Sequence, residues 1–474
     1  MASVIPAPVL HLEGDGSFDL TSTSTVGGEP AVAAYLSDVL GLELGNAHPA
    51  IELVIGVAPS PGGYTLDVSA TGIRIEADTP AALFAGAQTL RQLLPPDQFV
   101  GVTTATVPAT HIEDYPRFAY RGAMLDVARH FFTVEQVKRY IDDIALLKLN
   151  HLHLHLTDDQ GWRLAIESWP GLTGIGASTQ VNGGGGGFYT QQDYADLVTY
   201  AASRFITIVP EIDMPGHTNA AISAYPELGD GAVEPYEGIE VGFSSFAIRS
   251  EHTYEFIDDV VREVAALTPG PYLHLGGDES LATTDEDFRY FIGRATAIAA
   301  KHGKTLIGWH EMGRSDALPT GTIGQYWSFT TPQEGAAEHT LSFVRQGGRV
   351  IMSPADVAYL DIKYDTQSPL GLVWAEGPTS TRSSYGWDPA AIVPGLGEAQ
   401  LLGVEAPLWT ETIVTMEDVE SMAFPRIASV AEIGWSAADR PRDWSEFAER
   451  LNGFGARLDA AGIRHTPVPP SDAP

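Results

Sequence analysis

Short apolar segments alternate with amphipathic segments over most of the chain, and this alternation constrains the fold more than any other feature. The apolar segments have the length of buried strands, and the segments between them have the apolar spacing of helices. Repeated strand–helix units form parallel sheets, and eight such units close into a barrel. The expected strands are 120–129, 151–158, 207–214, 272–279, 305–311, 322–328, 349–355 and 403–411. We therefore predict an α/β protein with a (β/α)8 TIM barrel.

The part of the chain before the barrel has a different pattern. Segments 51–57 and 64–78 have the composition of strands, the second one a hairpin. Segment 79–95 predicts a helix with Thr79 as its N-cap and Pro80 at its first position. We expect a small α+β domain followed by the catalytic barrel with a C-terminal helix. The expected domain ranges are 1–112 and 113–474.

Charge and composition argue against several classes of function. The chain has 61 acidic and 27 basic residues, a net charge of −34, which disfavours binding to nucleic acid or to an anionic membrane. It has no cysteine, which excludes disulfides, thiolate metal sites and cysteine nucleophiles. No apolar run approaches the length of a membrane span, and the N-terminus does not resemble a signal peptide. We expect neither a nucleic-acid nor a membrane partner, and a cytoplasmic location unless a leader has been removed. The oligomeric state does not follow from these features.

The carboxyl ends of the expected strands carry many charged and aromatic side chains. In a barrel these ends build the active site, and burying so many charges without a function would be costly. The residues are Asp126, Arg129, His155, Asp158, Asp159, Glu211, Asp213, His217, Asp278, Glu279, Trp309, His310, Glu311, Trp327, Tyr359, Asp361, Trp409 and Glu411. We predict a catalytic pocket at this end of the barrel.

Carboxylates mixed with several tryptophans indicate a sugar-binding pocket. Indole faces stack on the C–H surfaces of pyranose rings, and charged groups bind hydroxyls. Glycoside hydrolysis needs acids, and the pair Asp278-Glu279 follows two glycines that allow close backbone approach to a ligand. Because adjacent residues of a strand point to opposite faces, we expect this pair not to be the acid and nucleophile of an ordinary retaining glycosidase. One carboxyl would handle the leaving oxygen, and the other would orient a group of the substrate.

The stretch HLHLHLTDDQGW (151–162) raises a metal-dependent alternative. His151, His153 and His155 share one face of a strand, and imidazoles and carboxylates are common zinc ligands. A metal-dependent barrel hydrolase is thus one alternative, although amidohydrolase-type barrels place their His-x-His after the first strand and here the run is on the second. A non-catalytic sugar-binding protein is another.

Five longer motifs occur in order between about 114 and 412. They are MLDVARHFF, LHLHLTDDQGWR, GFYTQQDYADLVTYAASRFITIVPEIDMPGHTNAA, HLGGDES and LIGWHEM. Together they resemble glycoside hydrolase family 20, the β-N-acetylhexosaminidases, and residues 1–112 resemble the small domain that precedes the barrel there. The resemblance implies an exo-acting, retaining enzyme that removes terminal β-linked GlcNAc, and GalNAc as well, from a glycan. It implies no cofactor and no metal.

The resemblance also implies residue roles. The substrate's 2-acetamido oxygen attacks its own anomeric carbon to form an oxazoline, as this family does. Glu279 would be the general acid and then the base, while Asp278 would orient the acetamido group and stabilise positive charge. The implied sugar-binding residues are Trp309, Trp327 and Trp409 around the acetamide, Tyr359 at its oxygen, Arg129 at the 3- and 4-hydroxyls, and Asp361 and Glu411 at the 4- and 6-hydroxyls. The implied supporting residues are His155, Asp158, Asp213 and His217, while His151 and His153 are assigned to packing. A family 20 lacto-N-biosidase, which releases a disaccharide, is the remaining alternative.

Overall fold

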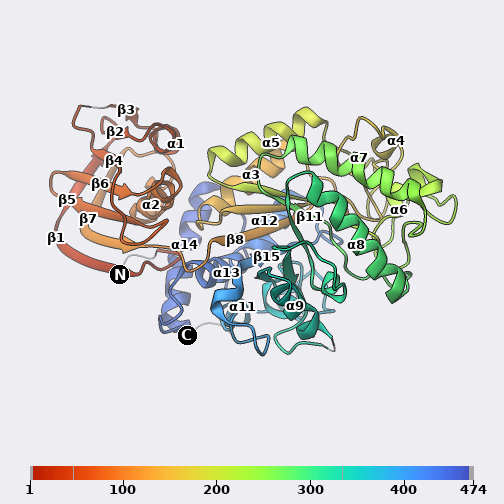
Figure 1. Cartoon of the computed structure of the whole chain (residues 1–474). Helices are drawn as coiled ribbons and strands as arrows, with labels where there is room; N and C mark the ends of the chain where they lie inside the picture. Colours follow the sequence, from red (N-terminus) through yellow and green to blue (C-terminus); the bar gives the residue numbers. More distant parts are fainter. Residues whose placement is uncertain (1–3, 46, 334, 469–474) are drawn as a thin grey trace.

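The structure is a computed structural model that describes residues 4–45, 47–333 and 335–468. A small sheet domain is followed by a closed barrel, and the two lie side by side (Figure 1). This architecture confirms the predicted α+β domain and (β/α)8 barrel. Within the described ranges, no helix combines the length and the apolar character needed to cross a membrane.

The described part of the small domain is a seven-stranded sheet with two helices on the face turned toward the barrel (Figure 1). The strand order is β1-β7-β5-β6-β4-β2-β3, antiparallel as far as β6 and parallel beyond it. The elements are β1 (Leu10–Thr21), β2 (Thr25–Gly28), α1 (Pro30–Leu40), β3 (Glu43–Leu44), β4 (Ile51–Ile55), β5 (Tyr64–Ser69), β6 (Gly72–Ala77), α2 (Pro80–Leu93), the 3-10 turn η1 (Pro96–Gln98) and β7 (Thr104–Asp114). Since β7 ends at Asp114 and the barrel begins at Tyr120, we propose a domain boundary between these residues.

Among the residues that the structure describes, eight parallel strands close the barrel, with the last strand paired to the first. They are β8 (Tyr120–Asp126), β9 (His151–His155), β10 (Thr207–Glu211), β11 (Tyr272–His274), β12 (Thr305–Trp309), β13 (Ile323–Tyr326), β14 (Val350–Met352) and β15 (Leu401–Ala406). Each strand occurs at a predicted segment but ends before that segment does. The side chains that follow the strands therefore belong to loops at the carboxyl end of the barrel.

The crossovers contain helices of unequal length. The α-helices are α3 (Val134–Ala145), α4 (Gly171–Gly174), α5 (Gln191–Ser203), α6 (Asn219–Ala224), α7 (Glu251–Leu267), α8 (Asp285–Lys301), α9 (Ala336–Arg345), α10 (Ala355–Ala358), α11 (Thr381–Tyr385), α12 (Met416–Ala423), α13 (Arg426–Trp435) and α14 (Trp444–Ala461), and the 3-10 turns are η2 (Pro226–Leu228), η3 (His310–Arg314) and η4 (Glu398–Gln400). Between β12 and β13, a segment described throughout, η3 replaces an α-helix. A Cβ on Gly313 would lie 2.0 Å from the carbonyl oxygen of His339, so η3 packs directly on α9.

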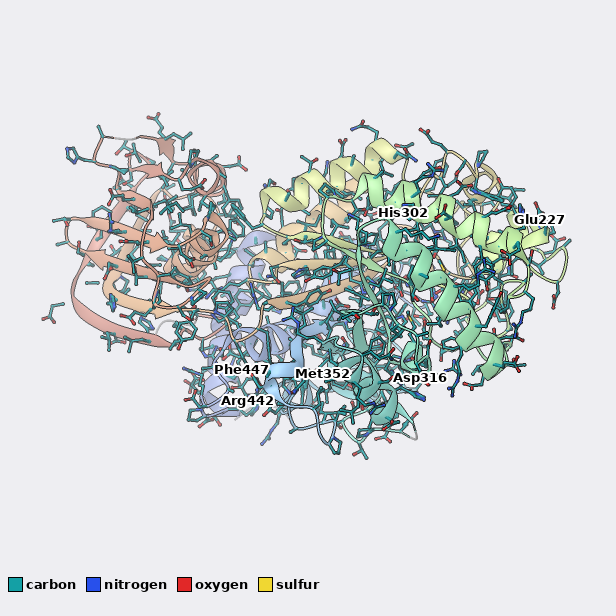
Figure 2. All side chains as sticks on the ribbon, viewed as in Figure 1. Glu227, His302, Asp316, Met352, Arg442 and Phe447 are labelled. Atoms are coloured by element: carbon teal, nitrogen blue, oxygen red, sulfur yellow. The ribbon has the colours of Figure 1, made fainter. Side chains whose placement is uncertain are left out.

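The small domain contacts the amino-terminal end of the barrel. Lys148 precedes β9, is fully buried, and donates a hydrogen bond to Asp114 at 2.8 Å. Phe205 precedes β10 and packs on Phe84 of α2, with ring centroids 5.2 Å apart. Glu227, in the connection after β10, lies at the end of the molecule remote from the small domain (Figure 2). The carboxyl-terminal face of the barrel is therefore turned away from the small domain.

Candidate active site

A pocket of about 260 Å³ opens at the carboxyl ends of the barrel strands. Its lining combines charged, aromatic and aliphatic side chains, and it includes both predicted catalytic residues and five of the predicted sugar-binding residues. The lining residues are Arg129, Ile239, Val241, Asp278, Glu279, Trp327, Tyr359, Leu372, Trp374, Trp409 and Glu411. The pocket thus lies at the end of the barrel where active sites of this fold occur.

Asp278 and Glu279 both face this pocket because the chain has left the barrel before it reaches them. Strand β11 ends at His274, and Gly276 and Gly277 have φ of +65° and +98°. Glu279 itself has φ of +41°, a conformation that non-glycine residues seldom adopt and that tends to occur at functional sites. The expectation that the two side chains point to opposite faces of a strand is therefore wrong, since neither residue is in the strand.

One histidine lies behind both carboxylates. Nε2 of His217 is 3.6 Å from Oδ2 of Asp278 and 3.7 Å from Oε2 of Glu279. Its Nδ1 is 3.1 Å from Oδ1 of Asp158. Burial works to lower the pKa of His217, but the surrounding carboxylates, Asp158 first among them, outweigh it and raise the pKa well above its usual value. This environment favours the positively charged, protonated form of His217, which faces the catalytic pair.

Asp158 connects the histidines to the arginine of the pocket. Its Oδ2 is 2.6 Å from Nε2 of His155 and 2.9 Å from Nη2 of Arg129. Burial alone would raise the pKa of Asp158, but Arg129 and His217 outweigh it and hold the pKa well below its usual value. The ionised Asp158 fixes Arg129, whose guanidinium also lies 4.9 Å from the centre of a Trp409 ring.

Asp213 supports the loop of the catalytic pair. Its Oδ1 accepts a hydrogen bond from the amide of Gly277 at 3.0 Å. Burial and the nearby Asp278 raise the pKa of Asp213 well above its usual value. Among the predicted supporting residues, His155, Asp158 and His217 form a connected chain, and Asp213 acts on the backbone beside that chain.

Trp309 and Asp361 stand behind the pocket wall. Trp309 is 1% exposed and lies beside Trp409, with ring centroids 5.9 Å apart. Asp361 is buried, and its Oδ1 accepts the amide of Trp409 at 3.5 Å. The structure thus brings both residues to the site, although neither is part of the cavity lining.

Glu211 is a buried hub to which the sequence argument gave no specific role. Its carboxylate accepts a hydrogen bond from Nε1 of Trp309 at 2.9 Å and contacts Nδ1 of His155. It also lies 3.0 Å from both His153 Nε2 and His274 Nδ1. Burial would raise the pKa of Glu211, but the histidines, His155 first, hold it well below its usual value. Glu211 thereby links the wall of the pocket to the histidines behind the acid.

Two more residues at the site were missed for different reasons. Trp374 is 44% exposed and lies in the long connection after β14, with a ring 6.1 Å from that of Trp327. It lies well past the end of the expected strand 349–355, so its position in the sequence did not mark it as a site residue. Glu311 was noted at a strand end without a role, and its Oε2 accepts Nε1 of Trp327 at 2.8 Å. Burial raises the pKa of Glu311 to about 7.

The buried histidines and carboxylates lie at ion-pair distances from one another. Among the described residues they form four groups with ligand atoms within 4.8 Å of one another: His153, Glu211 and His274; His155, Asp158 and Asp213; Asp158, Asp159 and His217; and Asp213, His217 and Asp278. His153 lies 3.0 Å from Glu211 and 3.0 Å from Glu405. Burial works to lower its pKa, but these two carboxylates outweigh it and raise the pKa to about 9. A protonated imidazole has no lone pair for a metal.

Comparisons with known proteins agree with this geometry. Residues 118–438 match the model of the glycosyl hydrolase family 20 catalytic domain, and residues 1–115 match that of the family's domain 2. The chain is 41% identical over 486 residues to a β-N-acetylhexosaminidase of Cellulomonas fimi, covering 98% of this chain and 95% of that one.

Two solved structures are similar over their whole length. The family 20 β-N-acetylhexosaminidase of Streptomyces coelicolor superposes with a TM-score of 0.95 at 45% identity, covering 100% of this chain and 98% of that one. A mutant β-hexosaminidase of Streptomyces plicatus in complex with its product GlcNAc gives a TM-score of 0.95 at 44% identity, covering 100% and 97%.

Proposed function

The chain belongs to glycosyl hydrolase family 20 and is a glycoside hydrolase of the β-N-acetylhexosaminidase type, and we propose that it removes single terminal sugars with retention through an oxazoline. The substrates are glycans with terminal β-linked GlcNAc and, in addition, GalNAc. The substrate itself supplies the nucleophile, and the chain supplies an acid, a stabilising carboxylate and a sugar pocket.

The main observation in support of this proposal is a set of buried carboxylate oxygens that have no hydrogen-bond partner among the described residues. Oδ1 of Asp278, Oδ2 of Asp361 and Oε2 of Glu411 have no hydrogen-bond partner among the described residues, although all three are buried. Buried polar atoms are nearly always paired. A sugar in the pocket offers matching donors, because its acetamido N–H suits Asp278 and its hydroxyls suit Glu411, with Asp361 behind the lining.

The first step forms the ring intermediate. The acetamido oxygen of the substrate bonds to C1 while the bond from C1 to the leaving oxygen breaks. The proton of Glu279 passes to that leaving oxygen. Burial raises the pKa of Glu279, and the charge of Asp278 raises it further, which favours the protonated form that this step needs. Asp278 accepts the acetamido N–H and offsets the positive charge that spreads over the oxazolinium.

The second step restores the enzyme. The Glu279 carboxylate takes a proton from water, the water oxygen bonds to C1, and the bond from C1 to the acetamido oxygen breaks. The sugar leaves with its original anomeric configuration because C1 has been inverted twice. No enzyme carboxylate is glycosylated in either step.

The small size of the pocket and the roles proposed for its lining support exo action. A volume of about 260 Å³ lies just below the usual range for small-ligand sites. In this proposal Arg129, fixed by Asp158, and Glu411 bind the hydroxyls at the non-reducing side of the sugar, where they would block a second sugar. Hydrolysis of an aryl lacto-N-bioside with release of the disaccharide would contradict this part of the proposal.

The decisive experiment concerns the nucleophile. We expect an aryl β-glucoside, which has a 2-hydroxyl, to be almost inert, and a thiazoline mimic of the intermediate to bind far more tightly than GlcNAc. A 2-fluoro glycoside with a good leaving group is incubated with the enzyme, and the intact protein is weighed by mass spectrometry. A stable glycosyl adduct together with weak thiazoline inhibition would show an ordinary double displacement instead.

A further inference from the structure

A second and larger cavity adjoins the active-site pocket at the carboxyl face of the barrel. It has a volume of about 610 Å³ and lies between the connection after β10 and the connection after β11. Phe243 and Val233 line it from the first connection, and Thr283 lines it from the second. The first connection also supplies Ile239 and Val241 to the active-site pocket. One loop therefore borders both cavities.

This loop is fixed in place although it has no regular structure. The segment 229–250, described throughout, contains neither helix nor strand. Loops of that length in compact domains are usually functional. The carbonyl of Gly238 accepts a hydrogen bond from Gln160 at 2.8 Å, and that of Glu234 accepts one from Asn219 at 2.9 Å. The cavity is accordingly preformed.

The cavity lies on the side of Glu279. In the proposed mechanism this acid protonates the leaving oxygen, so the leaving part of the substrate extends past Glu279. A Cβ on Gly242 would lie 2.7 Å from Leu281 and 3.1 Å from the Glu279 carbonyl oxygen. Gly242 and Leu281 thus form a ridge between the two cavities, and Leu281 is 78% exposed on it. A glycan that leaves the pocket past Glu279 crosses this ridge into the second cavity.

The lining contains aromatic, hydroxyl and charged side chains, the kinds that bind sugars. Phe243 is 45% exposed, and its ring is supported by Tyr236 at a centroid distance of 4.7 Å. The hydroxyls of Ser245 and Thr283 are 2.7 Å apart and face the cavity from its two walls. Arg249 also lines the cavity, where Asp287 holds its guanidinium at 2.6 Å. An aromatic face combined with fixed hydroxyl and charged groups suits a pyranose ring.

We propose that this cavity binds the distal sugars of an oligosaccharide leaving group, those beyond the sugar next to the cleaved bond. The enzyme then favours linear β-linked N-acetylglucosamine oligosaccharides of three or more sugars over the disaccharide. The inference rests on the proposed function, because the role of Glu279 as the acid defines the side of the pocket at which the leaving group departs.

The test is the dependence of kcat/KM on chain length. Phe243→Ala removes the aromatic face, and we expect kcat/KM for the tetrasaccharide to fall roughly two- to tenfold. The values for the disaccharide and for an aryl GlcNAc glycoside should not change. Phe243→Trp keeps an aromatic face and should keep the chain-length preference. Phe188→Ala is the matched control, since Phe188 is 42% exposed but lies outside the cavity lining.

Two outcomes overturn the inference. One is a wild-type enzyme whose kcat/KM does not rise from disaccharide to tetrasaccharide, and the other is a Phe243→Ala variant that keeps the wild-type ratio. Failure of the proposed function gives a different result, because the aryl GlcNAc glycoside itself is then not hydrolysed through an oxazoline. The two failures are distinguished by running the aryl glycoside and the oligosaccharides on the same preparations.

Discussion

His217 presents one nitrogen to two adjacent carboxylates that need opposite protonation states. In the proposed mechanism, Glu279 must carry a proton when the substrate binds, whereas Asp278 must be ionised to offset positive charge. Burial raises the pKa of Asp278 to about 6, with the His217 charge acting against it. The imidazolium thus favours ionised Asp278, and ionised Asp278 in turn keeps the proton on Glu279. The two roles support each other electrostatically.

Replacement of the acid should depend on the leaving group. We expect Glu279→Gln to lower kcat/KM for oligosaccharides by roughly 10²–10⁴ because the leaving oxygen is no longer protonated. Aryl glycosides with acidic phenols should lose far less in the first step. Steady-state kinetics on both substrates measure this difference. Glu286→Gln, at an exposed glutamate after the same strand, is the control, and near-normal oligosaccharide turnover by the Glu279→Gln variant would remove Glu279 from the acid role.

The pH profile tests the coupling between the pair. Activity should fall as the pH drops through about 6, where Asp278 takes up a proton, and fall again as the pH rises through the elevated pKa of Glu279. Asp278→Asn removes a negative charge beside Glu279, so the pKa of Glu279 decreases and the alkaline limb moves to lower pH. The rate should also drop by roughly 10²–10³. An alkaline limb that stays in place in this variant would show that Asp278 does not influence the acid.

At the scale of secondary-structure elements, the sequence predicted where helices and strands lie better than where they end. Thr79 caps α2 as expected, with its Oγ1 accepting the amide of Ala82 at 3.2 Å. The strands were predicted too long because the apolar pattern indicates buried residues. Residues remain buried beyond the last hydrogen bond between neighbouring strands. Ile212 and Met214 are buried beyond the end of β10, for instance. The predicted barrel places β9 and β11 on either side of β10, but alternation does not give the register that sets Glu211 beside three histidines.

The catalytic pair reaches the pocket because the chain leaves the barrel after β11. Gly276 makes this change of chain direction possible. Its φ is +65°, and a Cβ there would lie 1.6 Å from Oδ1 of Asp213. We expect Gly276→Ala to displace the loop and to lower kcat/KM by roughly 10²-fold, as small misplacements of catalytic groups do. Kinetics and thermal unfolding together measure the effect.

Gly303→Ala is the matched control for this prediction. Gly303 has a similar φ of +76°, but a Cβ there would meet no atom within 4 Å. That variant should lose about 1–2 kcal/mol of stability from the left-handed conformation and keep its activity. Equal kinetic effects of the two substitutions would contradict the role assigned to the contact between Gly276 and Asp213.

At the scale of the whole molecule, a buried ion pair joins the two domains at the end opposite the active site. Lys148 donates to Asp114 at 2.8 Å and to Tyr64 at 3.0 Å, and it lies 4.5 Å from the centre of a Trp435 ring. Asp114 belongs to β7 of the small domain, whereas Lys148 and Trp435 belong to the barrel. The hydrophobic pattern predicted two domains, but it did not predict this pairing between them, which spans 34 residues of sequence.

Removal of the Lys148 charge should lower the stability of the contact between the two domains and leave the catalytic activity unchanged. Lys148→Met leaves the Asp114 carboxylate buried without its cation, and breaking a buried pair in this way costs about 3–5 kcal/mol. Arg289→Met is the control, because Arg289 and Asp285 form an exposed pair on α8 whose loss should cost less than about 1 kcal/mol. Chemical unfolding measures both, and kcat/KM for an aryl GlcNAc glycoside should stay near the wild-type value in folded enzyme. Since the pair lies at the amino-terminal end of the barrel, a large loss of kcat/KM in stably folded Lys148→Met would show that the small domain acts on the site as well as on stability.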